Sequence, residues 1–223
     1  MDAYEFIKKA IILGDYSPGE RLTEQNLAKE LQISRTPIRE AIKRLESERL
    51  ITPLKRGVIV RKFSKEDIKQ IYDLRALLEG YAAAEAASRR NKIHLKRMKV
   101  ANEDFKEIIL NKNDKDIDQI KMIMDVNSSF HKAVLDASQN EHLHFHITNV
   151  TVLPLMFRSF YWYNDRQIQH SYELHETIRK AILNQDHERA RTAMLEHIYQ
   201  GRDHVLKLTE ENDLYNKTEE GKL

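Results

Sequence analysis

The sequence predicts a mainly α-helical protein in which a small helical domain with a β-hairpin precedes a larger antiparallel all-helical bundle. Three observations support this fold class. The 223 residues include only six glycines and four prolines, and residues with high helix propensity dominate. Apolar side chains recur at helical spacing along most of the chain. The exception is the stretch 50–63, where β-branched residues flank a glycine and predict two short strands.

The first 63 residues carry the start and stop signals of three helices and one hairpin. The first helix should end at Gly14, and the Ser-Pro-Gly of residues 17–19 predicts a turn. Thr23 and Ser34 are residue types that cap helices. Two helices joined by a short turn and followed by a hairpin describe a winged helix-turn-helix domain over residues 1–63. Its predicted elements are helices at 3–13, 23–31 and 34–48 and two strands within 50–63, around a turn at 55–57.

From residue 64 the pattern is helical almost to the end of the chain. Pro154 should kink the fourth helix of this region, and Asp186 should cap the last one. We therefore expect an all-helical domain over residues 64–209, followed by a polar, frayed tail at 210–223. The spacing of apolar residues predicts helices at 64–90, 93–111, 115–138, 141–163, 167–184 and 187–208.

Composition restricts the compartment and the chemistry. The chain has no cysteine, which excludes disulfides and thiolate metal sites. Charged residues among the first ten argue against a signal peptide. The longest stretch without Asp, Glu, Lys or Arg is His142–Phe157, which is too short and too polar to span a bilayer. We therefore expect a cytoplasmic protein with no membrane partner.

Positive charge is concentrated at the N-terminus. Residues 1–63 contain 13 Lys or Arg against 9 Asp or Glu, a net charge of +4. Residues 64–223 contain 24 against 26, a net charge of −2. A basic module joined to a near-neutral body suits a protein that binds nucleic acid.

The predicted helix that starts at Ser34 has the side chains of a recognition helix. Arg35 and Arg39 are four residues apart and share a face, and two guanidinium groups near a helix start can reach guanine edges in the major groove. Arginines on an exposed helix are more often simply solvated, but their place in the second helix of a helix-turn-helix favours base reading. The opposite face carries the apolar residues Ile38, Ala41, Ile42 and Leu45.

Other residues complete the predicted DNA surface. Ser34 and Thr36, together with the amides of the helix N-terminus, can bind phosphate. Arg56 and Gly57 would form the tip of the wing, where a glycine lets the backbone approach DNA closely. The sequence thus predicts double-stranded DNA as a partner.

The N-terminal region resembles the GntR family of bacterial regulators. The resemblance is continuous from Tyr4 to Val60 and is carried by the PGERL turn, the LTEQNLA helix, the SRTPIREA helix and a wing with RG at its tip. It implies a homodimer that binds a short, near-palindromic DNA operator. It also implies that Arg35 and Arg39 read bases and that Thr36 and Gly57 touch the DNA backbone or groove edge.

Three of the ten histidines lie on the apolar stripes of different predicted helices. They are His131, His175 and His197, and a helical bundle can gather such side chains around one ion. For each histidine taken singly, a hydrogen-bonded core residue is the more common explanation. The residues alone leave both interpretations open.

The helical region resembles the ligand-binding domain of the FadR subfamily, called FCD. The resemblance runs from Lys65 to about Lys207 and is carried by IKQIYDLRALLEGYAA, then N-x-x-x-H, then two histidines 22 residues apart. It implies a divalent metal on four side chains. A neutral asparagine here replaces the usual aspartate, which removes one negative charge from the site. Zinc is the first choice and nickel or manganese are alternatives. The implied ligands are Asn127, His131, His175 and His197.

Arg75 is a second candidate in this region, because it lies on the apolar stripe of the first long helix. It could anchor an anionic effector, as the resemblance implies, or form an i,i+4 salt bridge with Glu79. The aromatic cluster Phe157–Tyr163 could line a pocket, although an aromatic core is the simpler reading.

Three functions follow from these candidates. The leading hypothesis is a transcription regulator, acting as a repressor, whose operator binding responds to a small organic acid bound at the metal and Arg75. The second keeps the regulator but makes the metal structural, with an apolar or acyl effector. The third is a metal-dependent hydrolase fused to a DNA-binding domain. Because the sequence offers no nucleophile or general base for it, we do not expect an enzyme.

Overall fold

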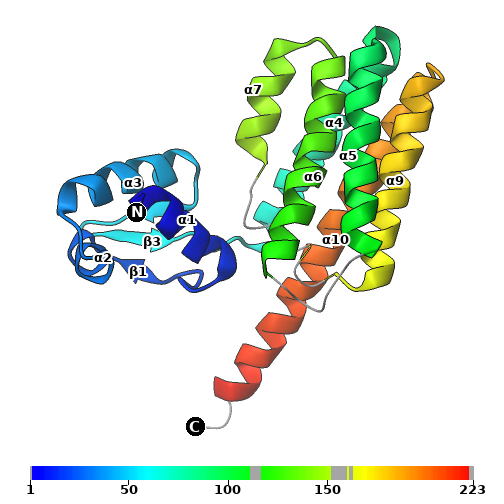
Figure 1. The fold of residues 1–223 in the computed structure, drawn as a ribbon. Coiled ribbons are helices and arrows are strands. Elements are labelled where there is room, and N and C mark those ends of the chain that lie inside the picture. The colour runs from blue at the N-terminus through cyan, green and yellow to red at the C-terminus, as the bar shows by residue number, and fades with distance from the viewer. Residues whose placement is uncertain (1, 111–116, 152–159, 161–162, 221–223) are drawn as a thin grey trace. The chain divides into compact units, whose positions relative to one another are not determined.

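The structure is a computed structural model that describes residues 2–110, 117–151, 160 and 163–220. It is mainly helical and divides into two compact units, Met1–Ser64 and Lys65–Leu223. The first unit combines helices with a small sheet, and the second is built from helices (Figure 1). The predicted fold class is confirmed.

The first unit packs three helices against a three-stranded antiparallel sheet. The sheet order is β1-β3-β2, and Leu22 of β1 and Pro53 of β2 both lie opposite Val58 of β3. The sequence prediction missed β1, because two residues give no alternating pattern to read. The elements are α1 (Ala3–Leu13), β1 (Arg21–Leu22), α2 (Glu24–Leu31), α3 (Arg35–Ser47), β2 (Ile51–Pro53) and β3 (Val58–Val60).

The two helices of the helix-turn-helix begin at the predicted caps, with one difference. Thr23 accepts a hydrogen bond from the amide of Asn26 at 3.2 Å, which caps α2. Ser34 holds the same position before α3, but its side chain makes no capping hydrogen bond. The turn between them passes through Gln32, which has a φ of 55°. A left-handed residue of this kind ends α2 and lets α3 leave in a new direction.

The predicted apolar stripe of α3 forms the centre of the first unit's core. Ile38 and Leu45 are fully buried, and Ile42 is half-buried against the same cluster. Leu27 of α2 and Val58 of β3 belong to that cluster too. Burying this stripe leaves the opposite face of α3, which carries the arginines, toward solvent.

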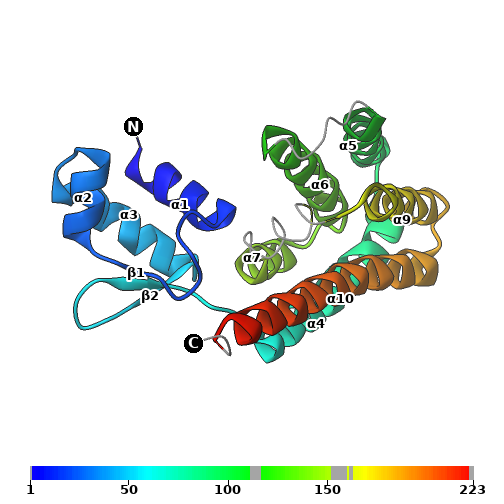
Figure 2. The ribbon, with the colours of Figure 1, turned by 90° about the horizontal axis from the view of Figure 1, so that it is seen from below.

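The second unit is an antiparallel bundle in which consecutive helices α4, α5 and α6 run in opposite directions (Figure 1). Helix α10 packs along α4 and α9, and α5 packs against α6 and α9. Figure 2 shows α10 lying alongside α4. This arrangement brings faces of α4, α6, α9 and α10 together inside the unit. The helices are α4 (Lys65–Arg89), α5 (Lys92–Leu110), α6 (Ile117–Ala137), α7 (Glu141–Val150), α9 (Asp165–Leu183) and α10 (His187–Glu220).

Two predicted helix ends in this unit are wrong. Helix α7 stops at Val150, and Thr151 is extended with a ψ of 114°, so no single helix covers 141–163. The β-branched run that starts at Val150 explains this end, while Pro154 and most of the aromatic cluster lie outside the described residues. Helix α10 continues to Glu220 instead of ending at 208, because residues 209–220 contain no glycine or proline that would end it.

Candidate metal centre and nucleic-acid interface

The structure brings the three histidines singled out in the sequence together in the second unit. Nε2 of His197 on α10 lies 3.1 Å from Nε2 of His131 on α6 and 3.2 Å from Nε2 of His175 on α9. One ligand atom from each residue lies within 4.8 Å of the others. Nitrogens that share an ion at about 2.1 Å are separated by about 3.0–3.4 Å. The three side chains therefore have the spacing of metal ligands.

Two of these imidazoles are held in the neutral form that binds metal. Burial, followed by the nearby His197 and His131 rings, holds the pKa of His175 well below its usual 6.5. Burial and the ring of His131 have the same effect on the pKa of His197. Neutral imidazole keeps the lone pair that a metal needs.

Asn127 stands where a fourth ligand could bind. It is 3% exposed and lies on α6, one turn before His131. Within the described part of the chain its side-chain Oδ1 accepts no hydrogen bond. A buried amide oxygen without a partner is costly, and a bound cation would satisfy it. Three imidazoles and one amide oxygen form a donor set that suits a divalent transition metal.

Arg75 forms the salt bridge that the sequence left as one of two alternatives. Its Nη2 lies 2.9 Å from Oε1 of Glu79, one turn along α4, and both side chains are buried. Oε2 of the same carboxylate lies 2.5 Å from Nδ1 of His131. The spacing of the sequence predicted a partner for Glu79 only in Arg75. Its contact with the histidine could not be read from spacing, because His131 is 52 positions away.

A pocket opens beside the three histidines. Asn127, His131 and His197 are in its wall. Arg75 lines it as well, so the salt bridge to Glu79 does not remove the arginine from the pocket. The space in it that can hold water-sized groups is about 40 Å³, which suits only a small ligand. The other lining residues are Tyr72, Phe160, Tyr163, Ser171, Ile198 and Gly201.

In the first unit, the two arginines predicted to read bases differ in their surroundings. Arg35, at the start of α3, is exposed. Arg39 donates from Nε and Nη2 to the carboxylate of Glu24 on α2, at 2.9–3.1 Å. The pair is at the surface, and the hydrogen bonds from Arg39 lower the pKa of Glu24. Nothing in the sequence pattern linked Glu24 to Arg39, since they belong to different helices.

The wing is fixed by a contact with β1. Gly57 has a φ of 81°, and a β-carbon there would lie 2.3 Å from the carbonyl oxygen of Leu22. The glycine is thus required by the fold itself, which the sequence prediction did not foresee. The guanidinium of Arg21 donates two hydrogen bonds, of 2.7 and 3.2 Å, to the carbonyl oxygen of Arg56. These contacts present the side chain of Arg56 at the hairpin tip.

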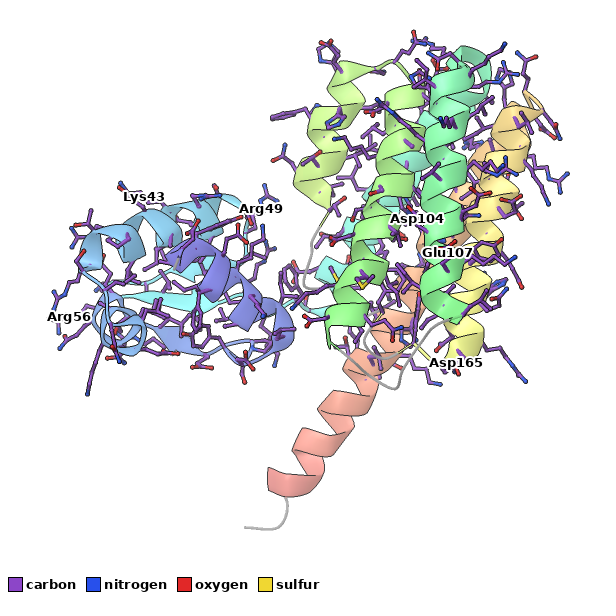
Figure 3. The ribbon with its side chains drawn as sticks, in the orientation of Figure 1. Lys43, Arg49, Arg56, Asp104, Glu107 and Asp165 are labelled. Carbon is purple, nitrogen blue, oxygen red and sulfur yellow. The ribbon has the colours of Figure 1, made fainter. Side chains whose placement is uncertain are left out.

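Basic side chains follow α3 and the wing. Figure 3 shows Lys43 on α3, Arg49 just after it and Arg56 at the hairpin tip. All three are exposed, as are Ser34 and Thr36 at the start of α3. A surface with this charge and helix arrangement is suited to the phosphate backbone and major groove of DNA.

Two domain families match the chain. Residues 1–60 match the bacterial regulatory proteins of the gntR family, and residues 70–200 match the FCD domain. Together these matches cover both structural units. Among the described residues, no helix has the length and apolar character needed to cross a membrane.

The relatives of the chain regulate transcription. LutR, an HTH-type transcriptional regulator of Bacillus subtilis strain 168, is 29% identical over 221 residues, which cover 89% of this chain and 97% of that protein. GlaR, an HTH-type transcriptional repressor of Escherichia coli strain K12, is 25% identical over 213 residues, with coverages of 89% and 91%. The solved structure of E. coli McbR/YncC has the same fold, with a TM-score of 0.73 over 93% of this chain and 96% of that one at 24% identity.

These findings decide between a regulator and an enzyme. Both matched families and both sequence relatives belong to transcription regulators. The hydrolase hypothesis therefore has no support, and the surface of α3 and the wing has its counterpart in a known class of DNA-binding domain. The chain is a DNA-binding transcription regulator of the GntR family, with an FCD domain following its helix-turn-helix domain.

Proposed function

We propose that this regulator is a repressor whose binding to a near-palindromic DNA operator is controlled by a small carboxylate held at a divalent-metal centre. The observation that carries the proposal is the convergence of three Nε2 atoms beside the unpartnered Oδ1 of Asn127, in the wall of a pocket that also contains Arg75. One place thus combines ligands for a cation, an arginine for an anion and a pocket that can hold the effector. The effect on DNA follows from coupling between two sites of one chain.

Zinc is the metal that we propose for this centre, with nickel or manganese as alternatives. His131, His175, His197 and Asn127 would hold it. When bound, it supplies positive charge at the end of the pocket. Asn127 contributes an oxygen without a negative charge, so the centre keeps more of the cation's charge than one with a carboxylate would. A centre of this kind favours an anionic ligand.

The effector is a short organic acid, because the pocket is small and has two sources of positive charge. Arg75 uses Nε and Nη2 for Glu79, and a guanidinium has five N–H donors. The remaining donors are available for a carboxylate. Ser171 adds a buried Oγ that has no hydrogen-bond partner in the described residues. A hydroxyl or carbonyl on the acid could engage it, whereas an acyl chain would leave these polar groups unsatisfied.

The first unit would provide the operator contacts. Arg35 is the base-reading residue that we place first, because it is exposed at the start of α3. Arg39 would join it after leaving Glu24. Ser34 and Thr36 would contact phosphate, with Arg56 and Gly57 at the wing. A regulator with these contacts works where the DNA is, in the bacterial cytoplasm.

A homodimer matches a palindromic operator, since each half-site takes one copy. Helix α4 offers a surface for it. Leu74, Leu77 and Tyr81 are spaced as one helical stripe and are 46%, 62% and 48% exposed. Apolar stripes of this kind mark association surfaces. We propose that two copies meet along this stripe.

The direct test combines metal and effector. Thermal shift of the metal-free protein is measured with a panel of small organic acids, each with and without zinc, followed by operator titration with the acids that stabilise it. We expect stabilisation by zinc, further stabilisation by particular acids only when zinc is present, and weaker operator binding with both. His175→Ala should lose all of these effects, while His170→Ala, on the exposed face of α9, should retain them. A wild-type protein that binds no divalent metal would refute the proposal.

A further inference from the structure

One buried carboxylate connects Arg75 to the candidate metal centre. Glu79 is 4% exposed. Its Oε1 accepts a hydrogen bond from Nε of Arg75 at 3.0 Å, and its Oε2 lies 2.5 Å from Nδ1 of His131. A buried charge needs partners on its oxygens, and here both oxygens have one. The two partners are a pocket residue and a histidine whose other nitrogen faces the centre.

We propose that Glu79 is a positioning residue, which holds His131 in the tautomer that presents the Nε2 lone pair to the metal. An ionised carboxylate has no hydrogen to give. The hydrogen in the contact with Nδ1 must therefore belong to His131. In a neutral imidazole the other nitrogen is then free of hydrogen, and Nε2 is the atom that lies 3.1 Å from Nε2 of His197. The inference rests on the metal centre proposed above.

Arg75 has a part in this arrangement because it keeps Glu79 ionised. Nη2 and Nε of its guanidinium lie 2.9 and 3.0 Å from Oε1 of Glu79, and a cation at this distance favours the charged form of a buried carboxyl group. A protonated carboxyl could donate to Nδ1 and reverse the tautomer of His131. Arg75 therefore acts on the metal centre through Glu79. This explains why a cation is buried in the apolar stripe of α4 even before an effector is considered.

Carboxylates behind metal-bound histidines have a known physical effect. They orient the ring and make the ligand nitrogen more basic, and their loss typically weakens metal binding by about 10–100-fold. Among the three histidines, the structure gives only His131 such a contact within the described residues; Nδ1 of His175 has no partner there. We therefore expect His131 to be the ligand whose tautomer is fixed before metal arrives.

The wild-type protein provides the first test and needs no variant. The full-length, metal-free protein is labelled with ¹⁵N at its histidine rings, and the tautomers are read by long-range ¹H–¹⁵N correlation at about pH 8, where an ordinary histidine is neutral. Assignment uses His131→Gln. We expect His131 to carry its hydrogen on Nδ1. A spectrum with the hydrogen on Nε2 would overturn the inference, whatever the metal does.

The second test replaces the carboxylate by an amide in Glu79→Gln. Arg75 should hold the amide oxygen, so the NH₂ group turns to Nδ1 of His131 and forces the hydrogen onto Nε2. We expect this tautomer reversal and a zinc Kd weakened by about 10–100-fold in a chelator-competition titration. Glu85→Gln is the matched control, since Glu85 pairs with Arg89 on the same helix at 2.6 Å. It should change neither property.

The outcomes separate this inference from the proposed function. If wild type binds no zinc, both are refuted. If wild type and Glu79→Gln bind zinc equally tightly and show the same His131 tautomer, Glu79 has no positioning role and the metal centre still stands. If Glu79→Gln does not fold, the wild-type tautomer remains decisive.

Discussion

The imidazole of His175 stacks on the ring of Phe130, with 4.1 Å between the ring centroids and 11° between the ring planes. Both residues are fully buried. The stack leaves the histidine ring little freedom to turn, and it directs Nε2 toward His197. The orientation of this candidate ligand is therefore set by packing, with no hydrogen-bond partner on Nδ1 within the described residues.

Replacing Phe130 should loosen this candidate ligand. An aromatic pair is worth about 0.5–1.5 kcal/mol beyond area burial, so we expect Phe130→Leu to weaken zinc binding by up to about tenfold. Phe145→Leu, at a 65% exposed position on α7, is the control and should bind zinc as wild type does. Competition with a coloured chelator gives both Kd values. Equal values for the two variants would show that the stack does not orient the ligand.

The stability of the metal-free protein should fall in mild acid. Burial and neighbouring imidazoles keep the folded-state pKa values of His175 and His197 well below 6.5. Below pH 6.5 the unfolded chain takes up protons at these residues and the folded chain does not. The free energy of unfolding should therefore decrease as the pH falls from 6.5, by at most about 1.4 kcal/mol per pH unit for each residue. Above that pH both states are neutral and the effect vanishes.

Urea unfolding in the presence of a chelator, at several pH values, measures this decrease. His175→Leu removes one of the two groups, so its stability should depend less steeply on pH than that of wild type between the lowered pKa and 6.5. Identical pH dependence in the two proteins would mean that His175 is protonated in the folded state.

Asn127→Asp should strengthen the metal centre and weaken its hold on an anion. An anionic oxygen attracts the cation more strongly than an amide oxygen does, and we expect zinc binding to tighten by about tenfold or more. Without metal, the buried carboxylate should lower the melting temperature. The same added charge should reduce affinity for an acidic effector. Asn149→Asp, at an exposed position of α7, is the control. Looser zinc binding in Asn127→Asp would place residue 127 outside the coordination sphere.

Arg35→Ala should relax base specificity. Loss of a bidentate contact with a base costs about 1–3 kcal/mol and affects the operator more than unrelated DNA. Titrations of the two DNAs at one salt concentration measure the ratio. Lys96→Ala, on the exposed side of α5, should leave both affinities unchanged. If Arg35→Ala weakens operator and unrelated DNA equally, Arg35 contacts phosphate instead of a base.

Leu77→Glu should separate the proposed dimer. Leu77 is 62% exposed in the single chain, so the charge should leave the fold intact and disturb only an apolar contact between copies. Ile93→Glu is a closely matched control, because Ile93 on α5 is also 62% exposed. Light scattering should give the monomer mass of 26.3 kDa for the first variant and twice that for the second. A dimeric Leu77→Glu protein would move the interface elsewhere.

The predictions from the sequence were most accurate where they depended on local signals. The helix from Ala3 to Leu13 has the predicted bounds, and the stripe of Ile38 and Leu45 is buried as expected, because spacing along one helix decides both. The two-residue strand at Arg21 gave no such signal. The end of α7 at Val150 was missed because apolar residues continue beyond it.

The same distinction applies to the candidate sites. His131, His175 and His197 could be selected because each lies on an apolar stripe, and the family resemblance grouped them. The partners of these side chains could not be identified in this way, because Glu79 contacts His131 only through the packing of α4 on α6. A prediction from one sequence identifies the groups on each helix, and the fold decides which of them meet.

If Arg39 contacts DNA as proposed, its ion pair with Glu24 is an internal competitor for the DNA. The carboxylate occupies two donors of the guanidinium, as a phosphate or guanine edge would. To contact DNA, Arg39 must release Glu24, which then attracts a cation from solution. That uptake offsets part of the counterion release that accompanies DNA binding. Operator affinity should therefore decline less steeply with added salt than the number of basic residues on this surface suggests, and the contact made by Arg39 should be the least sensitive to ionic strength.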